Sequence, residues 1–182
     1  GASRLDRTIC SSAGMFGMNE ALSGMRYGTE PEQFRHSRLI IAWGSNIHGT
    51  NVHLWPFVQE AKRNGARLIV IDPVKTRTAA VADQWLAIQP GTDLALALGL
   101  LHVILRDGLE NRAYVEAHTS GIDSLRTLAA SYPPDRVASL TGLAAHDIEA
   151  LAREYATTRP AAIRLNYGVQ RSERGGRAIR AI

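Results

Sequence analysis

The sequence predicts an α/β protein with a doubly wound, mostly parallel sheet flanked by helices, a variant of the Rossmann dinucleotide-binding fold. Short apolar runs with the length of buried strands alternate along the chain with longer segments of helical spacing. Each apolar run is followed by small or polar residues, as expected where strands end at a ligand-binding edge. The 182 residues suffice for one such domain with its own core.

Four segments have the apolar character of strands that are buried on both faces. In chain order they are residues 38–43, 66–71, 84–88 and 161–165. The third is the weakest of the four, and Pro90-Gly91 stops it. This order of strands, with helical segments between them, predicts βαβ units and parallel pairing.

Three longer segments, residues 52–64, 92–107 and 144–158, have the apolar spacing of amphipathic helices. Asn64-Gly65 is typical of a helix C-terminus, and Thr92 is a candidate N-cap. Residues 109–134 predict short helical pieces. Residues 173–182 begin a helix that stops without a capping glycine, so we expect a fragment of a longer protein.

The chain is expected to divide into a glycine-rich segment, residues 1–37, and an α/β domain, residues 38–182. Residues 9–28 contain several glycines and predict loops around short helical turns rather than one long helix; these glycines are Gly14, Gly17, Gly24 and Gly28. Thr29 and Glu32 have the spacing of a capping box, and Pro31 suits the start of a short helix before the first strand.

Composition excludes several classes of protein. Hydrophobic residues make up 45% and charged residues 21%, which is ordinary for a globular domain and not for a disordered chain. The apolar stretch 94–105 is interrupted by Gly99 and His102 and is shorter than the roughly 18 to 20 residues of a membrane span. We therefore expect no membrane span. The net charge of +4 is dispersed along the chain, so we also expect no nucleic-acid partner.

Candidate ligand-binding residues follow the ends of the predicted strands. The loops are 44–46, 72–73, 90–93 and 166–170, and all are rich in small and polar residues. Glycine lets a backbone approach a ligand closely, hydroxyls and amides bind phosphate, and a carboxylate holds a ribose diol or a guanine edge. Together the loops indicate a nucleotide, although each alone has the composition of an ordinary turn.

Two familiar nucleotide motifs are absent. Gly44 is followed by Ser45 and Asn46, and the next glycine, Gly49, does not have the spacing of the G-x-G-x-x-G pattern. Neither lysine of the chain follows a glycine, which excludes the P-loop pattern. A nucleotide would therefore bind by another arrangement.

Several short motifs follow one another along nearly the whole chain. They are Trp43-Gly44-Ser45-Asn46, Ile71-Asp72-Pro73, Pro90-Gly91-Thr92-Asp93, Thr141-Gly142 and Tyr167-Gly168-Val169-Gln170. Their order and spacing resemble the molybdopterin-dependent oxidoreductases of the dimethyl sulfoxide reductase and formate dehydrogenase type. The resemblance implies a domain that holds one guanine dinucleotide arm of a molybdenum bis(molybdopterin guanine dinucleotide) cofactor. The full enzyme would transfer two electrons or an oxygen atom at molybdenum.

The resemblance also implies roles for individual residues of the loops. Those implied to bind the cofactor are Gly44, Ser45 and Asn46 near the phosphates, Asp72 on the ribose, Asp93 at the guanine edge, and Gly168 and Gln170 at the pterin or its diphosphate, and Gly91 is a further cofactor-binding residue. The family often has arginine after Asp-Pro, whereas this chain has Val74. Arg77 or Lys75 is the candidate replacement for that positive charge.

Cys10 lies, in the context Arg7-Thr8-Ile9-Cys10, where branches of this family place a ligand to molybdenum. A thiolate suits such a metal centre. The open alternative is a small buried thiol without a metal. Ser11 stands where the formate dehydrogenases have histidine, so the resemblance does not point to formate. It further implies an upstream iron–sulfur cluster, a small-molecule redox substrate and an electron-transfer subunit.

Two other functions remain open from the residues. A central domain of a thiamine diphosphate enzyme has similar small-residue loops, but it explains Pro90-Gly91-Thr92-Asp93 less well. A stand-alone nucleotide-binding or cofactor-insertion module would use the same loops without catalysis.

Overall fold

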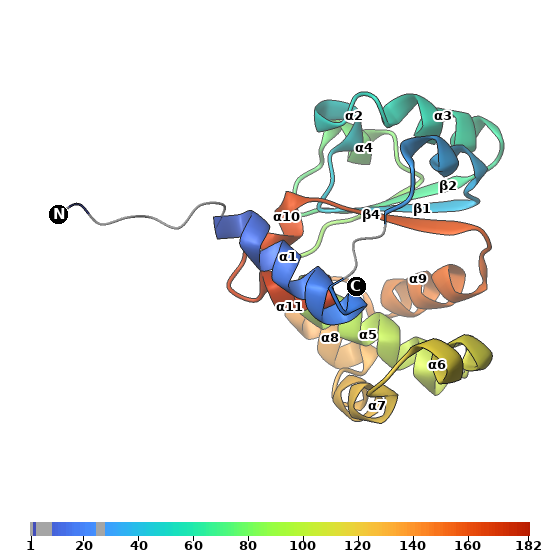
Figure 1. Cartoon of the computed structure of the whole chain (residues 1–182). Coiled ribbons are helices and arrows are strands. Elements are labelled where there is room, and N and C mark those ends of the chain that lie inside the picture. The colour runs from blue at the N-terminus through green and yellow to red at the C-terminus, as the bar shows by residue number, and fades with distance from the viewer. Residues whose placement is uncertain (1, 3–8, 25–27) are drawn as a thin grey trace.

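A parallel sheet of four strands runs through the centre of the computed structural model, which describes Ala2, residues 9–24 and residues 28–182 (Figure 1). The strands lie in the order β3-β2-β1-β4 and all neighbours pair in parallel. Their bounds are β1 (Leu39–Trp43), β2 (Arg67–Ile71), β3 (Gln84–Leu86) and β4 (Ala161–Leu165). The predicted fold class is confirmed, and the third strand ends at Leu86 instead of residue 88.

The helices cover both faces of the sheet. One face carries η1 (Pro31–His36), α2 (Ile47–Thr50), α3 (Trp55–Arg63) and α4 (Arg77–Ala80). The crossover from β3 to β4 lies on the other face and contains α5 (Asp93–Arg106), α6 (Arg112–His118), α7 (Ile122–Ala130), α8 (Pro134–Thr141) and α9 (Ala145–Thr157). Because the winding direction changes beside β1, the topological switch point lies between β1 and β4.

Alternate residues of the strands pack into two separate cores. Ile40 and Ala42 of β1 face α2, α3 and α4, whereas Leu39, Ile41 and Trp43 face α5, α8 and α9. All five residues of β1 are buried, as predicted for a strand covered on both faces. The residues of β4, at the edge of the sheet, are only half-buried.

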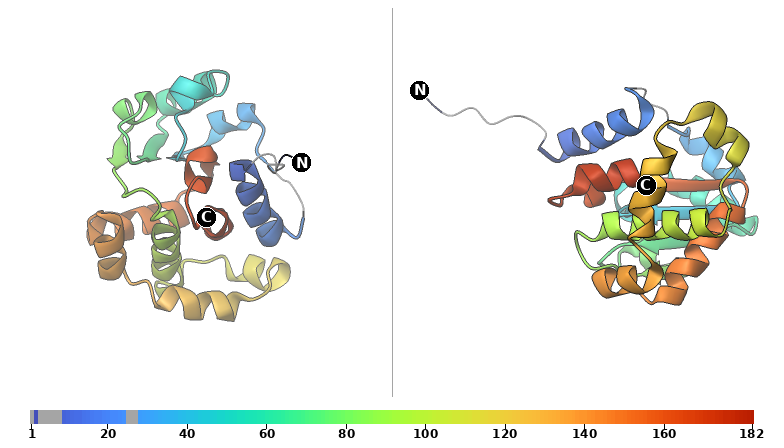
Figure 2. Two further views of the ribbon diagram at one scale, coloured as in Figure 1. Left: turned by 90° about the vertical axis from the view of Figure 1, so that its left-hand side faces the viewer. Right: turned by 90° about the horizontal axis from the view of Figure 1, so that it is seen from below.

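Residues Ile9–Leu22 form one continuous helix, α1, so the prediction of loops around short helical turns is wrong. The glycines serve close packing. A Cβ atom on Gly17 would overlap the carbonyl oxygen of Gly176 in α11 (Gly175–Ala181), and one on Gly14 would overlap the side chain of Gln170 in α10 (Tyr167–Gln170). Figures 1 and 2 show α1 lying along these two C-terminal helices. The segment of residues 1–37 thus contacts the α/β domain through α1. The division of the chain at residue 37 stays a prediction.

Two predicted helix caps differ from the structure. The short helix before β1 is a 3-10 helix whose N-cap is Glu30, and the expected Thr29–Glu32 capping box does not form its N-terminus. Thr92 does occupy the N-cap of α5, but its hydroxyl donates to the carbonyl of Gln89, 2.7 Å away, instead of capping a helix amide. The two helices therefore begin near the expected residues, but the predicted side-chain caps do not form their N-termini.

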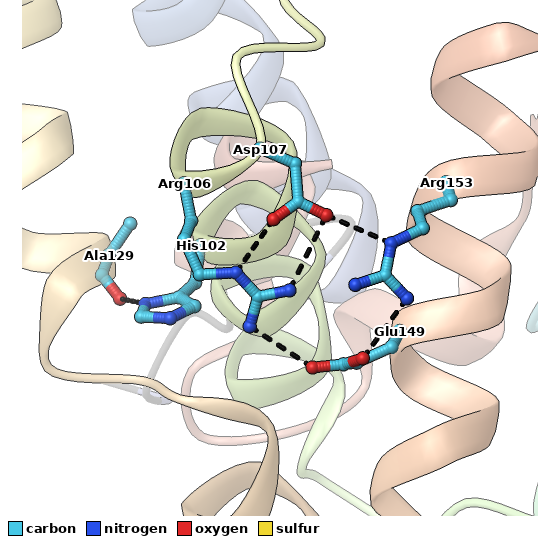
Figure 3. A network of polar contacts seen from close by, with 6 residues as sticks. All are labelled: His102, Arg106, Asp107, Ala129, Glu149 and Arg153. Atoms are coloured by element: carbon cyan, nitrogen blue, oxygen red, sulfur yellow. Dashed lines mark hydrogen bonds and ion pairs between the residues drawn. The ribbon is translucent and has the colours of Figure 1, made fainter.

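A ring of four charged side chains joins the C-terminal end of α5 to α9 (Figure 3). Arg106 donates to Asp107 and Glu149, and Arg153 donates to the same two carboxylates, with distances of 2.7 to 3.4 Å. The ring fixes the far end of α5, whose first residue is Asp93.

Within the described residues, none of the helices combines the length and hydrophobicity needed to cross a bilayer.

Candidate dinucleotide-binding site

The loops that follow β1 and β4 are in direct contact at the switch point. Gly44 has a φ of +56°, in the left-handed region that favours glycine, and a Cβ atom there would lie 2.8 Å from Cγ2 of Val169. A Cβ atom on Gly168 would lie 2.8 Å from the carbonyl oxygen of Gly44. Both glycines are therefore needed for the two loops to meet.

The loop after β3 reaches the same edge of the sheet. Gly91 is exposed, has a φ of +79°, and a Cβ atom there would lie 3.7 Å from Cβ of Ser172, just after α10. The structure thus brings the predicted loop 90–93 beside the segment that follows β4. This proximity was expected, because the carboxyl ends of parallel strands share one edge.

A hydrogen bond links the end of β1 to the start of α5. Nε1 of Trp43 donates to Oδ1 of Asp93 over 2.8 Å, and the Trp43 side chain is buried in the core below. Partial burial raises the pKa of the Asp93 carboxyl, and the Trp43 bond lowers it by a smaller amount. The pair lies at the predicted site, although sequence reasoning gave Trp43 no role of its own.

Asp72, directly after β2, is a second half-buried carboxylate at this edge. Its Oδ1 accepts a hydrogen bond from the backbone amide of Val74 at 2.9 Å, and its carbonyl accepts one from Nε1 of Trp85 at 2.8 Å. Burial raises the pKa of Asp72 despite the Val74 bond. The negative charge of Asp72 also raises the pKa of Asp93, so the two carboxylates lie close enough to interact.

Asn46 ties the loop after β1 to α4. Its Oδ1 accepts from the amide of Gly49, and also from the amide and hydroxyl of Thr78, at 3.0 to 3.4 Å. The Thr78 hydroxyl in turn accepts from the amide of His48 at 2.9 Å. Thr78 is fully buried, and its only signal in the sequence is its place shortly after the Ile71-Asp72-Pro73 motif. The predicted phosphate contact of Asn46 stays a prediction.

Ser45 is fully buried, and its Oγ has no hydrogen-bond partner among the described residues. A buried hydroxyl without a partner costs free energy, so such groups are rare in native proteins. The unsatisfied group lies between Gly44 and Asn46, within the loop predicted to bind phosphate.

Cys10 lies in the first turn of α1 and is half-buried. It precedes Gly14 by four residues, so both lie on the same face of the helix. The side chain of Gln170 packs against Gly14 on that face. The structure therefore brings the candidate metal ligand toward a candidate pterin contact, whereas Arg7 and Thr8 of the Cys10 motif lie outside the described residues.

The two candidate cations near Asp72 differ in their surroundings. The ammonium of Lys75 lies 5.7 Å from the ring centre of Trp85, a cation–π position. Arg77, the first residue of α4, is exposed. In the part of the chain that the structure describes, no three His, Cys, Asp or Glu side chains gather in a way that could hold a metal.

Comparison with known proteins finds similarity to one family over nearly the whole chain. Residues 8–182 match the family model described as molybdopterin oxidoreductase. The chain is 40% identical over 182 residues to the probable oxidoreductase YoaE of Bacillus subtilis and 31% identical over 166 residues to formate dehydrogenase H of Escherichia coli. These matches cover 100% and 91% of this chain, but 27% and 23% of the relatives.

A solved structure also matches the fold. Acetylene hydratase from Pelobacter acetylenicus superposes with a TM-score of 0.85 and 30% sequence identity, over 95% of this chain and 24% of that protein. The chain thus spans about a quarter of the length of the relatives it matches. On the strength of the family match over residues 8–182, the chain belongs to the molybdopterin oxidoreductase family.

Proposed function

We propose that this chain is the part of a larger molybdenum enzyme that binds one guanine dinucleotide arm of a bis(molybdopterin guanine dinucleotide) cofactor. Family membership implies a molybdenum–pterin cofactor. The chain matches only about a quarter of its relatives, so other parts of the enzyme would complete the site and the isolated chain would be inactive. The resemblance alone supports an iron–sulfur cluster, a small redox substrate and an electron-transfer subunit.

The observation that carries the proposal is the placement of Asp72 and Asp93. Two carboxylates from different loops are half-buried at the carboxyl edge of the sheet, and burial raises the pKa of both. An arrangement that disfavours ionised groups without a ligand is typical of a functional site. Neutral N–H and O–H donors, such as those of a guanine edge or a ribose diol, would satisfy these carboxylates.

The remaining residues of the edge fit a dinucleotide as well. The close contact between Gly44 and Gly168 holds the loops after β1 and β4 together at the switch point, where a ligand of an open parallel sheet would bind. The unpartnered hydroxyl of Ser45 lies in the loop proposed to face a phosphate, and the exposed Arg77 offers a positive charge nearby in sequence to Asp72.

Cys10 is the proposed protein ligand to molybdenum. When bound, the cofactor would supply two-electron or oxygen-atom transfer, and the chain would fix its position and surroundings. Cys10 suits this role because it is half-buried near the start of α1, on the face that Gln170 contacts. It is the only cysteine of the chain.

Nucleotide selectivity tests the dinucleotide site. We expect calorimetry to show that the chain binds GDP more tightly than ADP, and that Asp93→Asn removes this preference. Each charge-assisted hydrogen bond to guanine contributes about 1.5 to 3 kcal/mol before discounting for solvent. Asp123→Asn, at an exposed position in the first turn of α7, is the matched control. Equal affinity for GDP and ADP would contradict the proposal.

The family assignment replaces the thiamine diphosphate alternative. A stand-alone module that inserts the cofactor would bind the same nucleotide. It would differ by releasing intact cofactor to a separate enzyme, which transfer of molybdenum to an acceptor protein would reveal.

A further inference from the structure

The Trp43–Asp93 hydrogen bond joins residues from two different elements at the candidate site. Trp43 is the last residue of β1, and Asp93 is the first residue of α5. Nε1 of Trp43 lies 2.8 Å from Oδ1 of Asp93. This distance lies within the normal range for an N–H···O hydrogen bond.

Trp43 is held in place by its surroundings. Its side chain is 1% exposed and belongs to the core cluster that also contains Leu96 and Ala97 of α5. A side chain packed in this way cannot change rotamer without opening the core. The indole N–H is therefore a fixed donor, and it directs the carboxylate of Asp93 more strongly than a mobile surface group would.

The bond leaves acceptor capacity on Asp93. An ionised carboxylate has about four lone-pair positions on two oxygens, and Trp43 uses one of them on Oδ1. The opposing influences on Asp93 are burial and the nearby charge of Asp72, both of which favour the neutral form. A neutral carboxyl would offer a donor as well as acceptors and would lose its match to a guanine edge.

We propose that Trp43 is a positioning residue for nucleotide selectivity: its indole N–H holds the Asp93 carboxylate in one orientation and keeps it an acceptor for guanine. This inference rests on the proposed function, because it assumes that Asp93 reads the base. A purely structural role for the bond would instead affect stability without changing the preference between nucleotides.

Trp43→Phe tests the inference because it keeps an aromatic ring in the core and removes the N–H. We expect GDP affinity to fall about five- to tenfold, the effect of losing one orienting hydrogen bond, while ADP affinity stays unchanged. NMR titration of the Asp93 carboxyl should show a higher pKa in Trp43→Phe than in the unmodified chain.

Trp85→Phe is the matched control. It removes another indole N–H at the same sheet edge, which donates to the backbone carbonyl of Asp72 and not to Asp93. We expect it to leave both the ratio of GDP to ADP affinity and the Asp93 pKa unchanged. An equal loss of the ratio in Trp85→Phe would overturn the role of Trp43.

The two proposals fail in different ways. Loss of guanine preference in Asp93→Asn but not in Trp43→Phe would overturn the positioning role and leave the nucleotide site intact. No preference for GDP in the unmodified chain would overturn the site itself. In that case an unchanged Asp93 pKa in Trp43→Phe would overturn the positioning role as well.

Discussion

At the scale of single residues, Asp93 costs the ligand-free chain stability. Its folded pKa is raised, first by burial and further by the charge of Asp72, so the ionised form is less favourable in the folded than in the unfolded chain. The penalty is absent below the unfolded pKa and develops as pH rises through the folded pKa. The residue that we propose to contact the base therefore lowers the folding stability of the ligand-free chain.

We therefore expect Asp93→Asn to stabilise the ligand-free chain at pH 7. Asparagine keeps an oxygen that accepts from Trp43 but carries no charge, and the gain should be less than about 1 kcal/mol because the site is partly open to solvent. Urea unfolding measures it, and the gain should shrink as the pH falls and vanish below the unfolded pKa of Asp93. Asp123→Asn, an exposed control in a helix first turn, should give none. A destabilised Asp93→Asn chain at pH 7 would show that the carboxylate is structural.

At the scale of elements, the strands were predictable and α1 was not. Strands that are buried on both faces of a parallel sheet have continuous apolar sequences, so β1 and β2 can be recognised from the sequence alone. Gly14 and Gly17 instead lower the local helix propensity, and their role in α1 is to let α10 and α11 approach closely. That information lies more than 150 residues away in the chain, where no local pattern reports it.

The same reasoning applies to the site. The loops could be placed together from strand order alone, because one edge of a parallel sheet carries all its carboxyl ends. The contacts within the site could not. The Trp43–Asp93 bond spans fifty residues, and the Asn46–Thr78 bonds span thirty-two. Such contacts depend on the register of the sheet and on side-chain packing, which the sequence does not display.

The charged ring between α5 and α9 gives a prediction at the element scale. Hydrogen bonds to Arg106 and Arg153 lower the pKa of Glu149, so its contribution to stability is present at neutral pH and is lost as pH falls through the folded pKa. We expect Glu149→Gln to destabilise the chain at pH 7 and low salt. The difference should shrink at high ionic strength, because exposed charges are screened, and also at acid pH.

Glu116→Gln, at an exposed position on α6, is the control for this ring and should leave the urea midpoint unchanged at every salt concentration. A Glu149→Gln effect that does not depend on salt would indicate lost packing instead of lost charge pairing.

At the scale of the whole molecule, the carboxyl edge of the parallel sheet is the place to which we assign one dinucleotide arm of the cofactor. The sheet, with its two cores, positions the loops that we assign to the nucleotide. Cys10 belongs to α1, outside the sheet, and α1 is attached through glycine contacts to α10 and α11. A change at Cys10 should therefore reach the metal without disturbing Asp72 and Asp93, which follow β2 and begin α5.

This separation makes Cys10→Ala an informative variant of the full enzyme that we propose. If Cys10 binds molybdenum, X-ray absorption at the molybdenum edge should show one sulfur neighbour fewer, and Cys10→Ser should show an oxygen in its place. The unfolding free energy should change by about 1 kcal/mol or less, because the side chain is half-buried in the first turn of a helix. Ser11→Ala, the neighbouring half-buried position, should leave the spectrum unchanged. An unaltered sulfur count in Cys10→Ala, at full molybdenum content, would remove Cys10 from the metal site while leaving the assignment of Asp72 and Asp93 untouched.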